Sequence, residues 1–232
     1  MTTFSVKQKY EEAVKQIWDN DKYNNIPIKQ HGYALQETIE KGALLFVGLN
    51  PSNPNKDNWC GFYNNTQERT DDTHKYFSKF IDISKEVGLS WSHIDLLFVR
   101  WTNQKEVEQI MSEENGVEFL WEQLMISKQI IEEAKPEIIV VNNSLARRLL
   151  GFEKKGVETG KPFDVWMGFD FEFDNNIGTH RITNNEILSG TPVFFTSMLT
   201  GQRALDNGSY QRLIWHINYV KKFGMNGNNL YL

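Results

Sequence analysis

The chain has little that would hold a disulfide, a metal or a cofactor. It contains one cysteine, Cys60, among 232 residues, which excludes an internal disulfide, a cysteine-held iron–sulfur cluster and a cysteine-rich zinc site. Its five histidines show no metal-ligand spacing, and His93 and His216 have no carboxylate partner visible in the sequence. Phosphate-loop, dinucleotide-binding and nucleophile-elbow motifs are also missing. We therefore expect neither a metal nor a cofactor.

Long hydrophobic runs are missing too. No apolar stretch approaches the roughly 20 residues that cross a bilayer, and residues 1–18 lack the apolar segment of a signal peptide. A protein of this kind with one cysteine is expected in the cytoplasm, away from membranes.

Positive charge is in deficit. The 25 Lys and Arg residues are outnumbered by 30 Asp and Glu residues, which leaves a net charge of −5. Proteins that hold long duplex DNA through many phosphate contacts usually carry a basic face. Any basic cleft on this chain must therefore be local.

What is present is typical of a soluble globular protein, with 40% hydrophobic and 24% charged residues. The length favours one large domain over two small ones. We expect residues 1–232 to form a single domain, with a helical N-terminal extension over 1–40 and a peripheral tail over 224–232. The oligomeric state is not determined by the sequence.

Hydrophobic patterning predicts alternating helices and strands. Expected strands cover 43–49, 93–99, 137–142 and 192–197, with a hairpin or meander in 163–183. Expected helices cover 5–19, about 72–87, 116–134, 144–150 and 204–223, the second capped by Asp71 or Asp72. Such alternation indicates an α/β fold, a three-layer α/β/α sandwich with a mostly parallel central sheet.

The most informative segment is Gly48-Leu49-Asn50-Pro51-Ser52, directly after a buried strand. Open α/β sheets bind ligands outside the carboxyl ends of their strands. Asn50 is thus a candidate for orienting a water molecule or a polar ligand edge, because an amide has two donor hydrogens and an acceptor oxygen. The alternative is a turn whose Asn and Ser only satisfy backbone groups.

A second polar segment lies between the last expected strand and helix. It contains Ser197, Gly201, Gln202 and Arg203. A helix N-terminus favours anions, and Arg203 adds a bidentate phosphate donor. The alternative is a helix cap with an exposed Arg.

Two further segments are ambiguous. The polar loop 52–71 carries Trp59 and, next to Gly61, Phe62 and Tyr63, which either stack on a flat base or anchor the loop. Asn142 follows the third strand and either lines the same cleft or belongs to a helix cap. The triplet 100–102 has the same status.

With these residues in view, the chain resembles the uracil-DNA glycosylase superfamily. The strand and its Gly-Leu-Asn-Pro-Ser turn are similar to the first motif of the mismatch-specific and thymine glycosylases. Asp72-Thr73 opening a helix and Arg100-Trp101-Thr102 after a strand resemble uncharacterised members that share this turn. The resemblance covers most of residues 40–223.

The resemblance implies that a nucleotide is extruded and its base bound in a pocket, so the expected partner is a nucleic acid or nucleotide. Asn50 would hold the attacking water, Phe62 or Tyr63 would stack on the base, and Asn142 would read its edge. Met198 or Leu199 would be the wedge, and Arg203 would contact phosphate. The full set implied to contact substrate is Gly48, Pro51, Ser52, Phe62, Tyr63, Asn142, Ser197, Gly201, Gln202 and Arg203.

The chain also departs from that family. Thr196-Ser197-Met198 stands where the family has a His-Pro-Ser type motif, so the group that stabilises the leaving base is not identified. The first motif ends in Ser52 where active relatives have Gly. Three hypotheses follow: a DNA-repair hydrolase, a nucleotide- or base-binding protein of the same fold without glycosylase activity, and an interaction module.

Overall fold

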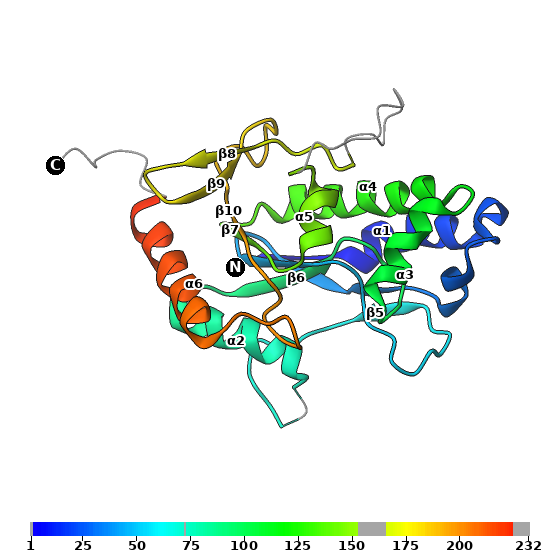
Figure 1. Cartoon of the computed structure of the whole chain (residues 1–232), viewed down its shortest axis with the longest axis horizontal. Coiled ribbons are helices and arrows are strands. Elements are labelled where there is room, and N and C mark those ends of the chain that lie inside the picture. Colours follow the sequence, from blue (N-terminus) through cyan, green and yellow to red (C-terminus); the bar gives the residue numbers. More distant parts are fainter. Residues whose placement is uncertain (1, 72, 153–165, 225–232) are drawn as a thin grey trace.

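The computed structural model describes residues 2–71, 73–152 and 166–224. A six-stranded sheet lies at its centre, in the order β6-β4-β7-β10-β9-β8 (Figure 1). Its first four strands are parallel, and the β8–β9 hairpin adds antiparallel strands at one edge. The strands are β4 (Leu44–Gly48), β6 (Trp91–Asp95), β7 (Ile138–Val141), β8 (Phe171–Asp174), β9 (Thr179–Ile182) and β10 (Pro192–Phe195). The predicted mixed α/β class with a mostly parallel sheet is confirmed.

Helices cover both faces of this sheet, because its central strands are apolar on both sides. Leu45 and Val47 of β4 pack with α1 (Val6–Asp19), α4 (Gly116–Ala134) and α5 (Ser144–Leu150). Leu44 and Phe46 point to the other face and pack with α2 (Lys75–Val87) and α6 (Asn207–Tyr219). Figure 1 shows α4 and α2 on opposite sides of the strands.

Shorter elements complete the described part of the chain. β1 (Thr3–Ser5) pairs antiparallel with β3 (Thr38–Glu40), and β2 (Ala34–Gln36) pairs parallel with β5 (Gly61–Tyr63). The remaining elements are η1 (Asp21–Tyr23), η2 (Pro27–His31), α3 (Gln104–Gln109), η3 (Ile110–Ser112) and η5 (Val220–Gly224). The first 40 residues therefore contain strands as well as the expected helix.

Hydrogen bonds and backbone geometry mark where several helices begin and end. Ser5 caps α1, since its Oγ accepts from the backbone N–H of Gln8 at 3.1 Å. The side chain of Asn143 caps α5 by accepting two backbone N–H groups. Gly88 ends α2 in the left-handed region at φ 62°. The 19 residues of α4 have the predicted bounds.

Other boundaries are corrected by the structure. The helix expected from about residue 72 begins at Lys75, and His74, rather than Asp71 or Asp72, caps it; residue 72 itself lies outside the described residues. The strand expected over 93–99 is β6, which ends at Asp95. The expected hairpin is present as β8 and β9, although part of the range 163–183 lies outside the described residues.

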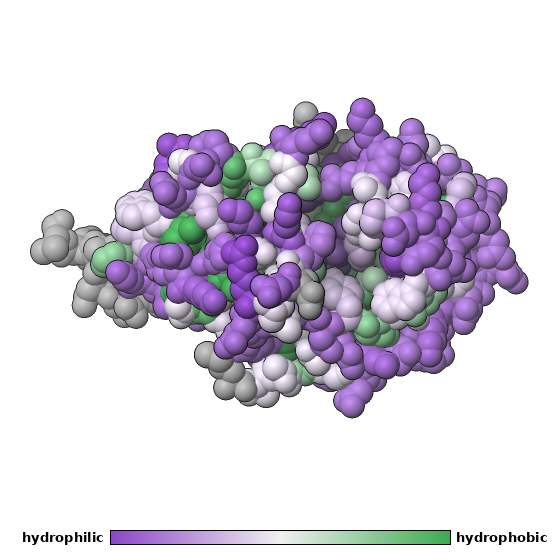
Figure 2. All heavy atoms as spheres, turned by 90° about the horizontal axis from the view of Figure 1, so that it is seen from below, coloured by the Kyte–Doolittle hydropathy of each residue, from purple (hydrophilic) through white to green (hydrophobic). Residues whose placement is uncertain are grey.

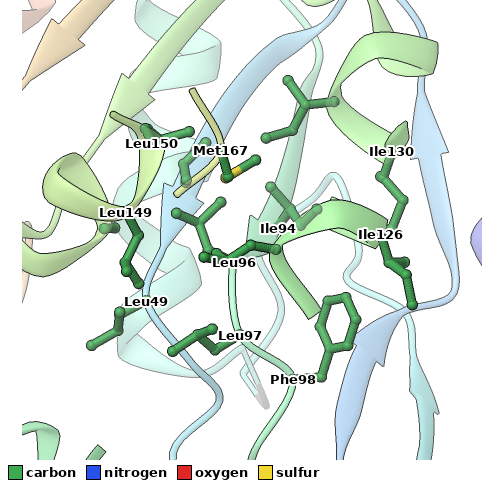
Figure 3. Close-up of a cluster of buried hydrophobic side chains, with 14 of the residues drawn as sticks. Leu49, Ile94, Leu96, Leu97, Phe98, Ile126, Ile130, Leu149, Leu150 and Met167 are labelled. Carbon is green, nitrogen blue, oxygen red and sulfur yellow. The ribbon is translucent and has the colours of Figure 1, made fainter. Parts of the chain in front are cut away.

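The larger of the two cores lies between the sheet and α4. Figure 3 shows Ile126 and Ile130 of α4 beside Ile94, Leu96 and Phe98, all buried. The segment after β6 continues into this core, and its backbone is bonded to the end of β4: Leu96 donates to Gly48 and Leu97 to Leu49. These contacts hold together the carboxyl ends of β4 and β6, which border the cavity described below.

The face in Figure 2 is mostly hydrophilic, with small separate hydrophobic areas. In the described part of the chain, no helix has both the length and the apolar character needed to span a bilayer.

Candidate functional site

A cavity of about 620 Å³ opens where β4, β6 and β7 reach their carboxyl ends. This volume lies within the range of about 300–1,000 Å³ typical of small-molecule sites. About half of the residues that line it are aromatic or apolar, and the others are polar or charged. The lining includes Gly48, Asn50, Pro51, Ser52, Trp59, Tyr63, Tyr76, His93, Asp95, Arg100, Trp101, Asn142, Met198 and Thr200.

The amide of Asn50 is held in one orientation at this cavity. Its Nδ2 donates to the carbonyl oxygens of Trp101 at 2.7 Å, Pro51 at 3.1 Å and Val99 at 3.2 Å. Because all three partners are acceptors, the nitrogen must be the atom that faces them. Oδ1 receives no hydrogen bond from any described residue and is left to accept one from a molecule in the cavity.

The polar turn is also tied to the segment after β6. The hydroxyls of Ser52 and Thr102 lie 2.9 Å apart. The Thr102 hydroxyl also accepts the backbone N–H of Asn53, and the backbone N–H of Trp101 donates to the carbonyl of Pro51. The turn thus satisfies backbone groups, as one interpretation of the Gly-Leu-Asn-Pro-Ser motif expects, and it also places Asn50 at the cavity; that Asn50 orients a water molecule or a ligand stays a prediction.

The sequence-predicted site residues are only partly brought together. Gly48, Asn50, Pro51, Ser52, Tyr63 and Asn142 line one cavity. Phe62 is not among the lining residues; its ring packs toward Tyr33, 6.4 Å between centroids, and against the larger core. Of the proposed wedge residues, Met198 lines the cavity, whereas Leu199 is buried in the core beside α2 and α6.

The structure corrects the expectation of an anion site before α6. Ser197, Gly201, Gln202 and Arg203 do not line the cavity, and all are exposed. The helix expected from residue 204 begins at Asn207, and Asp206 caps it by accepting the N–H of Ser209 at 3.0 Å. The carboxylate of Asp206 therefore already occupies this helix N-terminus, where the sequence analysis predicts a bound phosphate.

The floor of the cavity is a polar cluster set by the register of the sheet. Gly48 lies opposite Asp95 in the parallel pairing of β4 and β6. A Cβ at position 48 would lie 2.2 Å from Asp95 Oδ1, 3.0 Å from the hydroxyl of Tyr76 and 3.1 Å from His93 Nε2. Only glycine leaves room for these three polar atoms at one point beneath the turn.

The members of this cluster face one another across three strands and α2. Asn142 donates Nδ2 to the hydroxyl of Tyr76 at 3.3 Å, and that hydroxyl lies 3.5 Å from His93 Nε2. Asp95 Oδ1 lies 3.6 Å from the same nitrogen, longer than a hydrogen bond. His93 Nδ1 is buried without a partner among the described residues.

Burial keeps the acid and the imidazole uncharged. Desolvation raises the pKa of Asp95 from 3.8 to about 7 and lowers the pKa of His93 from 6.5 to about 3. The two groups are close enough for an ion pair. Both are nevertheless neutral between about pH 3 and about pH 7. Desolvation, with the nearby charge of Asp95, also raises the pKa of Tyr63 and of Tyr76.

Sequence reasoning missed Asp95 and found no carboxylate for His93. Both lie inside a segment interpreted only as a strand, and no motif marks them. The sole available signal was two ionisable residues in an otherwise apolar strand, because such residues are rarely buried unless they are paired or functional. Their convergence on Gly48 depends on strand pairing.

The rim of the cavity is aromatic. Trp59 is 42% exposed, and the guanidinium of Arg100 lies over its ring at 5.3 Å. Trp101 stacks on His31 at 4.5 Å. Arg100 is itself paired with Asp57 at 2.7 Å, so its charge is already balanced within the protein.

In the described ranges, no three His, Cys, Asp or Glu side chains group closely enough to hold a metal ion. No family model matches the chain, and the curated proteins and the solved structures contain no match either.

Proposed function

We propose that this chain hydrolyses the N-glycosidic bond of a damaged or deaminated base in DNA, in the manner of uracil-DNA glycosylases. The observation that carries this proposal is the orientation of Asn50: three carbonyls hold its nitrogen, and its oxygen is left as an acceptor in the cavity. An oxygen held this way can orient a water molecule for attack on C1′ of the sugar.

The remaining lining supports a flat heterocycle as the ligand. Tyr63 and Trp59 present aromatic surfaces to the same space, and Asn142 brings a buried amide to its inner end. Aromatic side chains stack on any base with an energy of about 1–3 kcal/mol. The position at the carboxyl ends of parallel strands is where α/β folds commonly bind ligands.

A second candidate is binding of a free base or nucleotide without action on DNA. The charge of the cavity favours it: among the lining residues that the structure describes, Arg100 is the one Lys or Arg, and Asp57 neutralises it. Arg203, the expected phosphate contact, is exposed away from the cavity. A DNA backbone would thus meet few unpaired cations at this opening.

The two candidates are separated by one set of assays. Single- and double-stranded oligonucleotides containing uracil or hypoxanthine are incubated with the chain and then treated with alkali. Glycoside hydrolysis produces cleavable abasic sites, and Asn50→Ala abolishes them, whereas Asn175→Ala, an exposed turn residue, does not. Intact oligonucleotides together with quenching of tryptophan fluorescence by free nucleotides or bases support the second candidate. Cleavage by Asn50→Ala at the wild-type rate contradicts the first.

A further inference from the structure

No hydrogen bond or ion pair within the described part of the chain explains why a carboxyl group, that of Asp95, is buried at the cavity. Its side chain is 10% exposed and lies at the cavity floor. None of the described residues forms a hydrogen bond with its carboxyl group within the usual distance. A buried carboxyl group without a partner costs folding free energy, so a residue of this kind in a cleft is a candidate for chemistry.

The groups that face Asp95 are known from every element around it. They are the imidazole of His93 on β6, the hydroxyls of Tyr76 on α2 and Tyr63 on β5, and the backbone of Gly48 on β4. None of them carries a positive charge at neutral pH, because burial lowers the pKa of His93 to about 3. The other charged lining residue, Arg100, is engaged by Asp57. Nothing in this surrounding therefore favours the ionised carboxylate.

Asp95 and Asn50 line the same cavity. Gly48, which Asp95 adjoins, is two residues before Asn50, and two residues span at most about 7 Å of chain. Both residues line the cavity, so a ligand that fills it lies against both side chains. An N-glycoside has two reacting parts, the sugar carbon and the base, and each can lie against one of the two residues.

On this geometry, and resting on the proposed glycoside hydrolysis, we propose that Asp95 is the catalytic acid that protonates the leaving base. The bond between C1′ and the base nitrogen breaks, and its electron pair goes to the base. The Asp95 proton is transferred to a ring nitrogen or a carbonyl oxygen of that base. Water held by Asn50 adds to C1′, and the proton it loses restores the carboxyl group.

The ionisation of Asp95 fits this task. With a pKa of about 7, the group is protonated in about half of the molecules at neutral pH and can release its proton to a base that gains electron density, the condition under which acid catalysis is efficient. The ligand class follows: a heterocycle that leaves poorly unless it is protonated.

The test compares leaving groups of different quality. Oligonucleotides carrying uracil, 5-fluorouracil or hypoxanthine are cleaved under single-turnover conditions by the wild type and by Asp95→Asn, which keeps the shape of the side chain. Since acid catalysis contributes about 10²–10⁴-fold, Asp95→Asn should slow uracil release by about 100-fold or more. Release of 5-fluorouracil should fall far less, because fluorine stabilises the departing anion without a proton.

The pH dependence tests the same role without any substitution. The wild-type rate should be level below pH 7 and fall about tenfold per pH unit above it as Asp95 ionises, and Asp95→Asn should lack this fall. Equal losses for uracil and 5-fluorouracil, or a wild-type rate that rises through pH 7, would overturn the proposal. Turnover unchanged in Asp95→Asn contradicts the role of Asp95 alone. A wild type that leaves all three bases attached contradicts glycoside hydrolysis itself.

Discussion

Replacing Asp95 by Asn should stabilise the fold at alkaline pH and leave its stability nearly unchanged in acid. The folded protein raises the pKa of this carboxyl group from 3.8 to about 7 because the cavity floor desolvates it. The folded state therefore binds the proton more tightly than the unfolded chain does. The stability that this proton gives is fully present below pH 3.8 and is lost as the pH rises to 7.

The magnitude follows from the difference between the two pKa values. Each unit of difference corresponds to about 1.4 kcal/mol, so the ionised carboxylate costs the folded state on the order of 4 kcal/mol above pH 7. His93 acts in the opposite direction. Its pKa is lowered from 6.5 to about 3, so its contribution is fully present above pH 6.5 and is lost as the pH falls toward 3.

These two slopes oppose each other between pH 3.8 and 6.5. Wild-type stability should therefore vary little there through these groups, whereas the stability of Asp95→Asn, which retains only His93, should increase with pH. Urea unfolding at pH 4, 6 and 8 measures the free energies, with equal m-values as the sign that both variants unfold alike.

A matched control is Asp174→Asn. Its pKa is lowered mainly by the hydrogen bond from Arg181, which lies 2.7 Å away. Its contribution is therefore present above its ordinary pKa of 3.8 and is lost only below it, so this variant should be destabilised at pH 4, 6 and 8 alike. If Asp95→Asn is less stable than the wild type at pH 8, the carboxylate is not a desolvated, unpaired group and the reasoning fails.

Three further predictions concern the frame of the site. Gly48→Ala should destabilise the fold by about 1–3 kcal/mol, because the new methyl group would lie 2.2 Å from Asp95 Oδ1; the second substitution Asp95→Ala should restore part of this loss in thermal unfolding. Asn143→Ala should cost about 1 kcal/mol, since two backbone N–H groups at the start of α5 lose their acceptor; an unchanged melting temperature would contradict this. Gln123→Leu should cost about 1–3 kcal/mol or more, because its Oε1 accepts two buried backbone N–H groups after β6; fast amide exchange in that segment is the expected signature.

Much of the secondary structure could be predicted from local patterns. The bounds of α4 are marked by apolar residues at helical spacing and by Pro136 shortly after its end. β4 is an unbroken apolar run that ends at Gly48, and Ser5 and Asn143 are caps of the expected type. These features depend on residues close in sequence, so the sequence contains the information that decides them.

Boundaries set by competing caps were less predictable. Several polar residues precede α2 and α6, and each is chemically able to cap a helix. The structure uses His74 and Asp206, since the packing of each helix on the sheet decides where its first turn lies. The later start of α6 removes Arg203 from the helix N-terminus and with it the expected anion site.

By itself, the sequence determined an α/β chain with a mostly parallel sheet and Asn50 at the carboxyl end of a buried strand. Only the tertiary structure decided what surrounds that amide. Asp95 meets Gly48 through the register of two strands more than 40 residues apart, and two of the three carbonyls that orient Asn50 belong to the distant residues Val99 and Trp101. Strand order and register depend on the burial of whole faces and on contacts between distant segments, which no local pattern encodes.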